Sequence, residues 1–429
     1  MRGVTLPIET VFVMEMAPIK FGLGATDEIG YDAKRLGLGR VLIFTDRNIA
    51  ELGLPEKIRG LLAEEGIKAE IFDGVEVEPT DRSMEEAAAV TRESTVDGFI
   101  AVGGGSSIDT CKAVNLLTTH PAPLLDYINK PVGRGVPVPG PLRPLIAVPT
   151  TAGTGSETTA VTVTHVVDQN VKAGVSHRLL RPTLGVVDPL NTLTVPAEVT
   201  AAAGSDILTH AIESYTTRPY NARPKHHPPD RPAYIGANPA SDMWCEKAIE
   251  YVGRYLRRAV LNGNDLEARV HLALAANYAG IGFGNAGVHI PHAVAYPIAG
   301  LVRDYVPAGY RTRHPLIPHG MSVILTAPAA FRFTHATAPE RHLRAAELMG
   351  FPVAGLSDAE RREALPRALL NLMRDVGIPN GLTAVGYGER DVAALIEGTL
   401  KQPRLLSGAP RTVGAGELDW ILRDSMRYW

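Results

Sequence analysis

Asp206 and His210 lie four residues apart in "GSDILTHAIES", so on a helix both side chains project from one face. Alone, such a pair is more typical of a helix cap and a buried structural histidine. Further histidines follow downstream at His289, His292, His314 and His319. One carboxylate with several imidazoles suits Fe²⁺, Zn²⁺ or a similar divalent ion, and this supply of ligands favours a metal site.

The stretch "AGVHIPHAVAYPIAG" (286–300) places His289 three residues before His292 and Tyr296 four residues after it. This spacing is compatible with metal binding, with acid–base chemistry and with an ordinary helix surface. Pro291 fits the first turn of a helix, where its missing N–H costs little. Tyr296 then shares the face of His292. A phenol has an unperturbed pKa of about 10, so Tyr296 is expected to donate a hydrogen bond rather than act as a base.

A second kind of signal is a glycine-rich turn after a buried strand, "GFIAVGGGSSIDTCKA". Glycine lets backbone N–H groups approach an anion closely, and the following helix N-terminus adds a favourable dipole. The turn matches neither a P-loop nor a GxGxxG fingerprint. A tight turn that needs glycine for geometry alone is the alternative. Three glycines followed by two hydroxyls favour phosphate binding at Gly103, Gly104, Gly105, Ser106 and Ser107.

A similar loop, "VPTTAGTGSETT" (148–159), follows another strand and offers the hydroxyls of Thr150, Thr151 and Thr154. Ligands of open α/β sheets lie outside the carboxyl ends of the strands, so two such loops favour a dinucleotide. Asp46 ends the strand "VLIFTD" and is placed to bind a ribose diol. Its carboxylate would repel a 2′-phosphate, which favours NAD over NADP. Asp46 is equally suited to cap a helix together with Asn48.

The elements that position these residues divide the chain in two. From Arg40 to about Pro189, buried-strand candidates at 40–46, 68–74, 97–105 and 144–151 alternate with amphipathic helical patterns at 48–66 and 83–94, and 157–168 and 184–189 add strand material. This alternation predicts an α/β domain whose parallel sheet has helices on both faces.

After Pro196 long alanine-rich helical patterns follow, at 196–217, 242–261, 265–284, 339–350 and 359–377. They predict an all-α second domain, with 218–242 as a long irregular loop. We expect the domains to span residues 1–195 and 196–429.

Composition narrows the class of protein. The 429 residues are 45% hydrophobic and 21% charged, with a net charge of −3, as in a soluble globular protein. No basic excess indicates a nucleic acid or a membrane as a partner. Two cysteines, Cys111 and Cys245, argue against a disulfide framework and a cysteine-based zinc site. The first residues do not resemble a signal peptide, and no apolar run spans a bilayer, so we expect a cytoplasmic location.

Four motifs, "GGGSSIDTCKA", "PTTAGTGSETT", "GSDILTHAIES" and "PHAVAYPIAG" with a later "PHG", resemble those of the iron-containing (group III) alcohol dehydrogenases. The resemblance runs from about Lys20 to the C-terminus. It implies a dinucleotide-binding α/β domain followed by a helical metal-binding domain. The implied metal ligands are Asp206, His210, His292 and His319, holding Fe²⁺ or alternatively Zn²⁺. His289 and His314 match no ligand of the family.

The resemblance also implies NAD, with NADP less favoured. Asp46 then binds the adenosine ribose, and residues Gly103 to Ser107 bind the pyrophosphate, with Asp109 in the same motif. Thr150, Thr151 and Thr154 correspond to the loop beside the nicotinamide, and Lys172 to a nearby lysine. The implied catalysis is hydride transfer between an alcohol and nicotinamide, with His292 and Tyr296 at the substrate.

Tyr296 stands where many members of the family carry a further histidine. That difference and the segments "HAIESYTTRPY" and "GIGFGNAGVHIPHAVAYPI" are similar to the hydroxyacid–oxoacid transhydrogenases. The similarity implies oxidation of 4-hydroxybutyrate coupled to reduction of 2-oxoglutarate, and a homodimer or higher homo-oligomer, with residues 10–16 as an interface strand. A plain alcohol dehydrogenase, a lyase similar to dehydroquinate synthase, and a non-catalytic NAD-binding protein are the alternatives.

An acid substrate needs a cation near the metal. The sequence offers Arg218, Arg223, Arg231 and Arg303, each of which is more typical of a solvated surface arginine.

Overall fold

The structure is a computed structural model that describes residues 7–228, 231–312 and 314–429. Its N-terminal part is built on a six-stranded parallel sheet with the strand order β1-β8-β5-β4-β2-β3. The strands are β1 (Ile19–Phe21), β2 (Arg40–Phe44), β3 (Lys68–Phe72), β4 (Gly98–Gly103), β5 (Leu145–Pro149) and β8 (Leu184–Val187). The predicted parallel sheet is confirmed.

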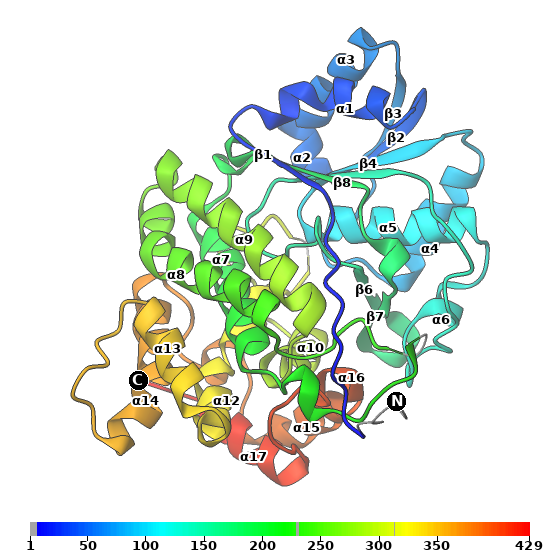
Figure 1. The fold of residues 1–429 in the computed structure, drawn as a ribbon. Helices are drawn as coiled ribbons and strands as arrows, with labels where there is room; N and C mark the ends of the chain where they lie inside the picture. The colour runs from blue at the N-terminus through cyan, green and yellow to red at the C-terminus, as the bar shows by residue number, and fades with distance from the viewer. Residues whose placement is uncertain (1–6, 229–230, 313) are drawn as a thin grey trace, which may run out of the picture.

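Helices cover both faces of this sheet because alternate strand residues point to opposite sides. Val41 and Ile43 of β2 pack with α1 (Ile29–Arg35) and α3 (Leu54–Glu64). Leu42 and Phe44 pack with α4 (Asp81–Arg92) and α5 (Gly105–Thr119) on the other side. Figure 1 shows α1 and α3 at the top of the molecule and α4 and α5 below the sheet.

Three details differ from the sequence-based expectations. The segment after the second loop does not join the main sheet: β6 (Val161–Val166) pairs antiparallel with β7 (Val171–Ser176) as a separate hairpin. The helix expected at 48–66 is divided into α2 (Arg47–Glu51) and α3, because Gly53 between them adopts a left-handed conformation with φ 81°. The short α6 (Leu124–Tyr127) and the edge strand β1 carry too few residues for a periodic signal.

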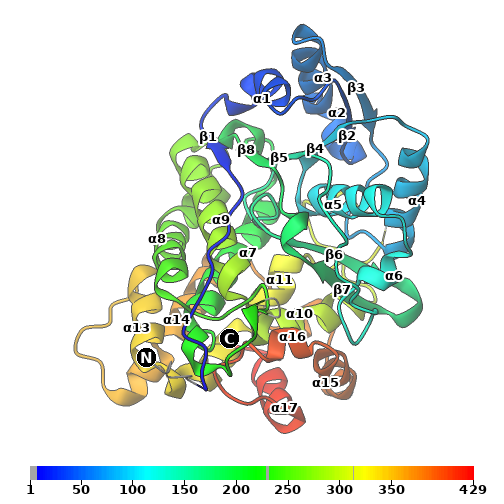
Figure 2. The ribbon, with the colours of Figure 1, turned by 45° about the vertical axis from the view of Figure 1, so that its right-hand side comes forward.

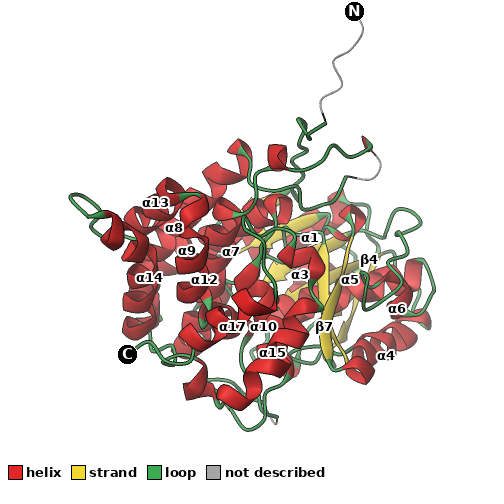
Figure 3. Ribbon diagram, turned by 90° about the horizontal axis from the view of Figure 1, so that it is seen from below, coloured by secondary structure: helices red, strands yellow, loops and turns green. Residues whose placement is uncertain are grey.

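Beyond β8 the described chain is a helical body (Figure 3), as predicted. Among its described residues no helix combines the length and hydropathy that crossing a membrane requires. Its helices are α7 (Ala197–Thr216), α8 (Pro239–Leu261), α9 (Leu266–Ala286), α10 (Ile290–Gly300), α11 (His319–Ile324), α12 (Ala327–Thr334), α13 (Pro339–Leu348), α14 (Asp358–Asp375), α15 (Val392–Leu400), α16 (Pro403–Leu406) and α17 (Ala415–Asp424).

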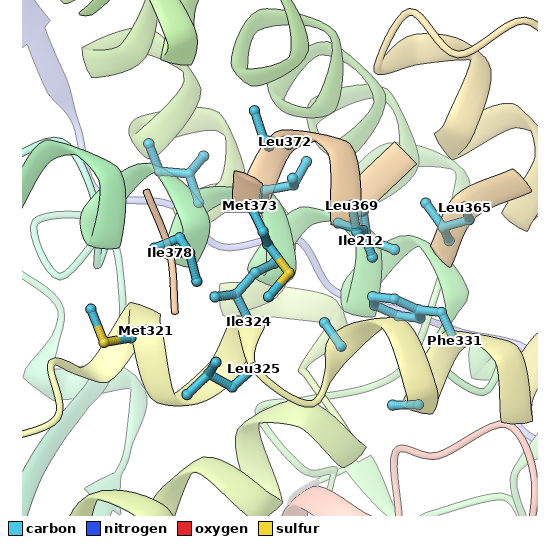
Figure 4. Packing of buried hydrophobic residues seen from close by; sticks show 14 of the residues in the cluster. Ile212, Met321, Ile324, Leu325, Phe331, Leu365, Leu369, Leu372, Met373 and Ile378 are labelled. Carbon is cyan, nitrogen blue, oxygen red and sulfur yellow. The ribbon is translucent and has the colours of Figure 1, made fainter. Parts of the chain in front are cut away.

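The core of the helical body anchors the helices that carry the candidate metal ligands. Ile212 of α7 and Ile324 of α11 are fully or almost fully buried. Both belong to one apolar cluster with residues of α14 and α12, and Figure 4 shows this packing. The α14 residues in that view are Leu365, Leu369, Leu372 and Met373. Thus α7 and α11 are each held by a packed apolar face, which leaves their polar residues in fixed positions.

Small residues bring the two parts of the molecule together. Gly155, with φ 61°, lies against α9, where a Cβ on Gly155 would come within 2.7 Å of the Cα of Gly280. A Cβ on Gly153 would come within 3.0 Å of the Cβ of Ala203 on α7. The loop after β5 therefore fits between α7 and α9. Figure 2 shows the sheet edge directly above these helices.

Candidate functional site

Four side chains from three separate segments converge between the sheet edge and the helical body. The ligand-type atoms of Asp206, His210, His292 and His319 all lie within 4.8 Å of one another. Asp206 Oδ1 is 3.8 Å from His210 Nδ1, 3.7 Å from His292 Nε2 and 3.8 Å from His319 Nε2. The resemblance named this set, and the structure brings all four together.

Local structure explains each position. Asp206 and His210 are one turn apart on α7. His292 lies in the first turn of α10, after Pro291, and His319 begins α11 after Pro318. Phe283 of α9 stacks on the ring of His210 with a centroid distance of 3.9 Å. Helix ends and stacking thus restrict the imidazoles before any ligand binds.

Glu213 is a buried partner of this cluster that sequence reasoning missed. His292 Nδ1 donates a hydrogen bond to Glu213 Oε2, and the backbone N–H of His289 donates to Oε1 at 2.8 Å. A ligating histidine commonly uses its other ring N–H in this way, which fixes the tautomer and orientation. The spacing Asp206, His210, Glu213 (i, i+4, i+7) was the available signal, because it places all three on one helix face.

The charges around the cluster favour a cation. Burial alone disfavours ionised Asp206, yet the imidazoles of His210 and His319 hold the pKa of this carboxyl well below its usual range. Burial lowers the pKa of His210 to about 3. For His292 burial acts in the same direction, but the carboxylates of Glu213 and Asp206 raise its pKa to about 9. Two buried carboxylates, Asp206 and Glu213, thus lie beside three imidazoles. The pKa values of His210 and His319 are lowered by burial, so these two imidazoles carry little positive charge.

The donor set fits a divalent ion. Asp206 Oδ1, His210 Nδ1 and His292 Nε2 are buried and have no hydrogen-bond partner among the described residues. Buried polar atoms are normally satisfied, so such a convergent group indicates a missing partner. Ligands with bonds of about 2.1 Å in a tetrahedral arrangement lie about 3.4 Å apart. The three distances from Asp206 Oδ1, 3.7–3.8 Å, are a few tenths of an ångström longer than this value. Three imidazoles with one carboxylate suit iron or zinc.

The glycine-rich turn and the threonine loop meet at the carboxyl ends of the neighbouring strands β4 and β5. The backbone N–H of Thr150 donates to the carbonyl of Gly103 at 3.0 Å. A Cβ on Gly104 would lie 3.5 Å from Thr151 Oγ1, and one on Gly105 would lie 2.7 Å from Thr154 Cγ2. The two predicted loops therefore form one surface beside the N-terminus of α5.

This surface also has unsatisfied groups. Gly103 has φ 153°, and a Cβ there would lie 2.3 Å from Ser107 Oγ. The hydroxyls of Ser107 and Thr150 are buried and have no partner among the described residues. Glycine backbone, free hydroxyls and a helix N-terminus together fit the phosphates of a dinucleotide.

Asp46 is a helix cap, as one of its two sequence interpretations predicts. Its Oδ1 caps α2 by accepting hydrogen bonds from the N–H groups of Asn48 and Ile49. Its Oδ2 lies toward the glycine turn, 3.6 Å from a Cβ built on Gly103. Capping therefore leaves one oxygen directed at the candidate nucleotide surface.

Three further predicted residues form hydrogen bonds or ion pairs with other residues of this chain. Ser106 Oγ accepts a hydrogen bond from the backbone N–H of Glu78. Asp109 accepts from Ser156 Oγ and from the N–H of Val163, and burial raises its pKa. Lys172 pairs with Glu78, a second residue that sequence reasoning missed.

The cluster around Asp206 and the surface formed by the glycine turn and the threonine loop line one cavity of about 180 Å³. Its lining includes the four clustered side chains together with Gly105, Ser106, Thr154, Lys172 and Tyr296. The Tyr296 ring lies 6.3 Å from that of His319, measured between centroids. Burial raises the pKa of Tyr296 to about 12, so its hydroxyl is protonated near neutral pH. Tyr234 and Arg404 also line the cavity, and no sequence motif indicated them.

The remaining candidates lie elsewhere. His289 is buried beside Thr216, whose Oγ1 is 3.2 Å from its Nε2, and burial lowers its pKa to about 4. His314 is exposed. Among the arginines, Arg231 pairs with Glu9 and Arg303 with Asp391. Arg218 and Arg223 line a neighbouring cavity.

Comparison with known proteins agrees with this geometry. The chain is 45% identical over 421 residues to the mitochondrial hydroxyacid-oxoacid transhydrogenases of Bos taurus and Homo sapiens, covering 97% of this chain and 90% of each relative. Among solved structures, a 1,3-propanediol oxidoreductase superposes with a TM-score of 0.85 at 32% identity, covering 97% of this chain and all of that one.

The expected cytoplasmic location is contradicted by these relatives, which are mitochondrial proteins. The expectation rested on first residues that do not resemble a signal peptide and on the lack of an apolar run that spans a bilayer. These two patterns argue against secretion and membrane insertion, and they do not distinguish the cytoplasm from a mitochondrial location.

Residues 17–189 match the family described as iron-containing alcohol dehydrogenase, and residues 233–426 match its C-terminal part. Iron and NAD are the cofactors of this family. The reported relatives are oxidoreductases, and neither the lyase nor the non-catalytic alternative has a counterpart among them. The chain belongs to the iron-containing alcohol dehydrogenase family and is an oxidoreductase.

Proposed function

We propose that this protein transfers a hydride between a hydroxyacid and NAD, as a hydroxyacid–oxoacid transhydrogenase. The observation that supports this most is the shared cavity. Four metal-type side chains, three of which have a buried ligand atom without a hydrogen-bond partner in the described chain, line the same cavity as the glycine–threonine surface. A substrate oxygen at these side chains and a nicotinamide on that surface would thus be neighbours.

Asp206, His210, His292 and His319 are the proposed metal ligands. A bound divalent ion supplies Lewis acidity toward the substrate oxygen, and bound NAD supplies the hydride acceptor. Glu213 accepts a hydrogen bond from the Nδ1–H of His292 and so keeps Nε2 directed at the cluster. The stacked Phe283 restrains the ring of His210 and excludes water from one side.

For the dinucleotide we propose the glycine turn as the pyrophosphate site and Thr150, Thr151 and Thr154 as the nicotinamide side. Asp109 supports this surface from beneath by binding Ser156 and β6. Lys172, held by Glu78, borders the same space. The outward oxygen of Asp46 suits a ribose diol and opposes a 2′-phosphate, so NAD is the expected cofactor rather than NADP.

Tyr296 is proposed as a hydrogen-bond donor to the substrate oxygen. It lies one turn after His292 on α10 and lines the cavity. With a pKa of about 12 its O–H retains its proton while an oxygen of the substrate gains negative charge. It therefore positions and stabilises the substrate, and does not act as the base.

The transhydrogenase subtype rests on the relatives at 45% identity across nearly the whole chain. In that reaction 4-hydroxybutyrate is oxidised and 2-oxoglutarate is reduced while the nicotinamide stays bound. The test is to incubate the purified protein with both acids, with and without added NAD. Full turnover without added NAD is expected. Strict dependence on added NAD, with simple alcohols accepted equally well, would show a plain dehydrogenase instead.

We further propose domains at residues 1–195 and 196–429. Residues 1–6, 229–230 and 313 of these ranges lie outside the described chain. The last strand of the sheet ends at Val187 and α7 begins at Ala197, which supports this boundary. A homodimer is proposed through residues 10–16, where Val11, Val13 and Met16 are exposed apolar side chains. Mass measurement in solution tests the oligomeric state.

A further inference from the structure

Arg404 occupies an unusual position for an arginine. It lies on the short helix α16, next to α10 near the bottom of Figures 1 and 2, and it lines the cavity that contains His292 and Tyr296. Its guanidinium carbon is 4.9 Å from the centroid of the Tyr234 ring. A guanidinium stacked on an aromatic ring keeps its N–H edge available for a planar, charged partner.

No such partner is present among the described residues. Arg404 Nη1 is buried and makes no hydrogen bond there, and none of the described carboxylates forms an ion pair with the side chain. Lys172, the other lysine or arginine among the described residues that line this cavity, pairs with Glu78. A buried unpaired donor on a charged group is costly, so Arg404 is the cation of this cavity that still lacks an anion.

A second cavity of about 480 Å³ adjoins the first and shares Tyr234, Val288 and Arg404 with it. Arg218 and Arg223 line this second space, and Arg223 Nε is another buried nitrogen without a partner in the described chain. The described lining residues include no aspartate or glutamate. Two arginines beyond Arg404 thus make the approach to it favourable for anions.

The chemistry of the two proposed substrates matches one fixed cation. In 4-hydroxybutyrate the carboxylate carbon is three carbon–carbon bonds from the carbinol carbon. In 2-oxoglutarate the distal carboxylate carbon is three such bonds from the keto carbon. One arginine at a set place in the cavity therefore serves both half-reactions, whereas a neutral alcohol gains nothing from it.

We propose that Arg404 determines specificity for acids by binding the distal carboxylate of both substrates, which enters past Arg218 and Arg223. This inference rests on the proposed function, because it assigns a residue to the acid substrates of the same site. Arg218 and Arg223 contribute attraction at longer range, while Arg404 forms the direct, bidentate contact.

The first test compares 4-hydroxybutyrate with 1,4-butanediol, which has the same chain length and reacting carbon but no carboxylate. For Arg404→Gln in the metal-loaded enzyme, we expect kcat/KM for the acid to fall roughly 10- to 100-fold relative to that for the diol, mainly through KM. Arg404→Lys should recover part of the loss. Arg303→Gln, which removes an exposed arginine paired with Asp391, is the matched control and should leave the ratio unchanged.

A second measurement keeps this inference separate from the proposed function. Titration calorimetry of 2-oxoglutarate into the metal-loaded enzyme with NAD⁺ measures binding without reaction, since both molecules are oxidised. Arg404→Gln should raise Kd at least tenfold. An unchanged Kd and an unchanged acid-to-diol ratio in a variant that still binds metal would overturn the role of Arg404. A different result would refute the proposed reaction alone. In that case the wild-type protein turns over neither acid, but it binds 2-oxoglutarate and the Arg404→Gln variant does not.

Discussion

The proposed metal cluster and the proposed nucleotide surface line one cavity but are built in opposite ways. The cluster consists of four side chains whose identity matters, positioned by helix spacing on α7 and by the first turns of α10 and α11. The nucleotide surface consists mainly of backbone, made accessible by glycines at Gly103 to Gly105. Metal binding by the cluster therefore depends on which side chains are present. Nucleotide binding by the surface depends on glycines that leave the backbone N–H groups accessible.

This difference predicts unequal sensitivity to substitution. Each ligand of an ion supplies a large, irreplaceable share of its binding, whereas a phosphate surface distributes its contacts over many N–H groups and hydroxyls. Changes in the cluster should therefore remove metal and activity together. Changes at the surface should weaken NAD and leave the metal in place.

The largest effect is expected for His210→Ala. Loss of an imidazole from the cluster should abolish stoichiometric iron and lower kcat/KM at least about a thousandfold, more than loss of a mere orienting partner. Metal analysis and steady-state kinetics measure this. His314→Ala removes an exposed histidine outside the cluster and should match wild type. If His210→Ala retained iron and turnover, His210 would not be a metal ligand, and the proposed difference between the two regions would be wrong.

Glu213→Gln tests whether the buried carboxylate orients His292. The amide fills the same space but accepts a weaker hydrogen bond, so metal affinity should fall roughly 10- to 100-fold. Competition with a chelator measures the change. Glu198→Gln, an exposed residue in the first turn of the same helix, is the control. Equal affinities for the two variants would reduce Glu213 to a packing residue.

Gly103→Ala should weaken NAD while leaving the metal content unchanged. The residue has φ 153° and the new Cβ would lie 2.3 Å from Ser107 Oγ, so the turn must shift. Strain of this kind costs about 1–3 kcal/mol, which predicts roughly a tenfold or greater rise in Kd for NAD. Gly60→Ala on α3, where nothing lies within 4 Å, should leave NAD binding intact. If Gly103→Ala lost iron instead, the two regions would not be separable.

Tyr296→Phe removes one hydroxyl from the boundary between the two regions. We expect kcat to fall about 3- to 10-fold, the effect of one neutral hydrogen bond, with iron content and NAD affinity preserved. Rapid-mixing measurement of NADH formation reports the step directly. A loss of several thousandfold would instead indicate that the phenol transfers a proton.

The smallest effect is expected for Asp46→Ser. Serine retains the capping hydrogen bond of α2 but removes the negative charge, so stability should change by less than about 0.5 kcal/mol. The preference for NAD over NADP should decrease about fivefold, as expected for one charge at a solvated edge. Thermal unfolding and the two cofactor affinities separate these roles. Unchanged preference would leave Asp46 as a cap only.

Sequence patterns were most informative where local rules suffice. Strands β2 to β5 and helices α7, α9 and α14 follow their periodicity to within a few residues, because a strand or helix needs only its own apolar face. The sequence does not identify β6 and β7 as a separate hairpin. Its alternation is the same as that of a strand in the main sheet, and only its long-range partner distinguishes it.

The candidate site shows the same limit. The spacing of Asp206 and His210 predicts that both lie on one helix face. Only the family resemblance identifies His292 and His319 as metal ligands, because no local rule selects them over His289. Glu213 has a helical signal, because it follows Asp206 by seven residues and His210 by three. Glu78, Tyr234 and Arg404 had none, because they reach the cavity from segments far apart in the chain.

By itself the sequence determined the chemical inventory: a glycine-rich strand–helix turn, a helical Asp–His pair, surplus histidines and a two-part α/β and α architecture. Residue type and short-range spacing are local properties, so the sequence alone is enough to identify them. Tertiary structure alone decided which histidines meet at Asp206, that Glu213 holds one of them, that Asp46 keeps one oxygen directed at the glycine turn, and that Arg404 is left without an anion. These depend on packing of distant segments, where burial converts ordinary polar groups into groups that require a partner.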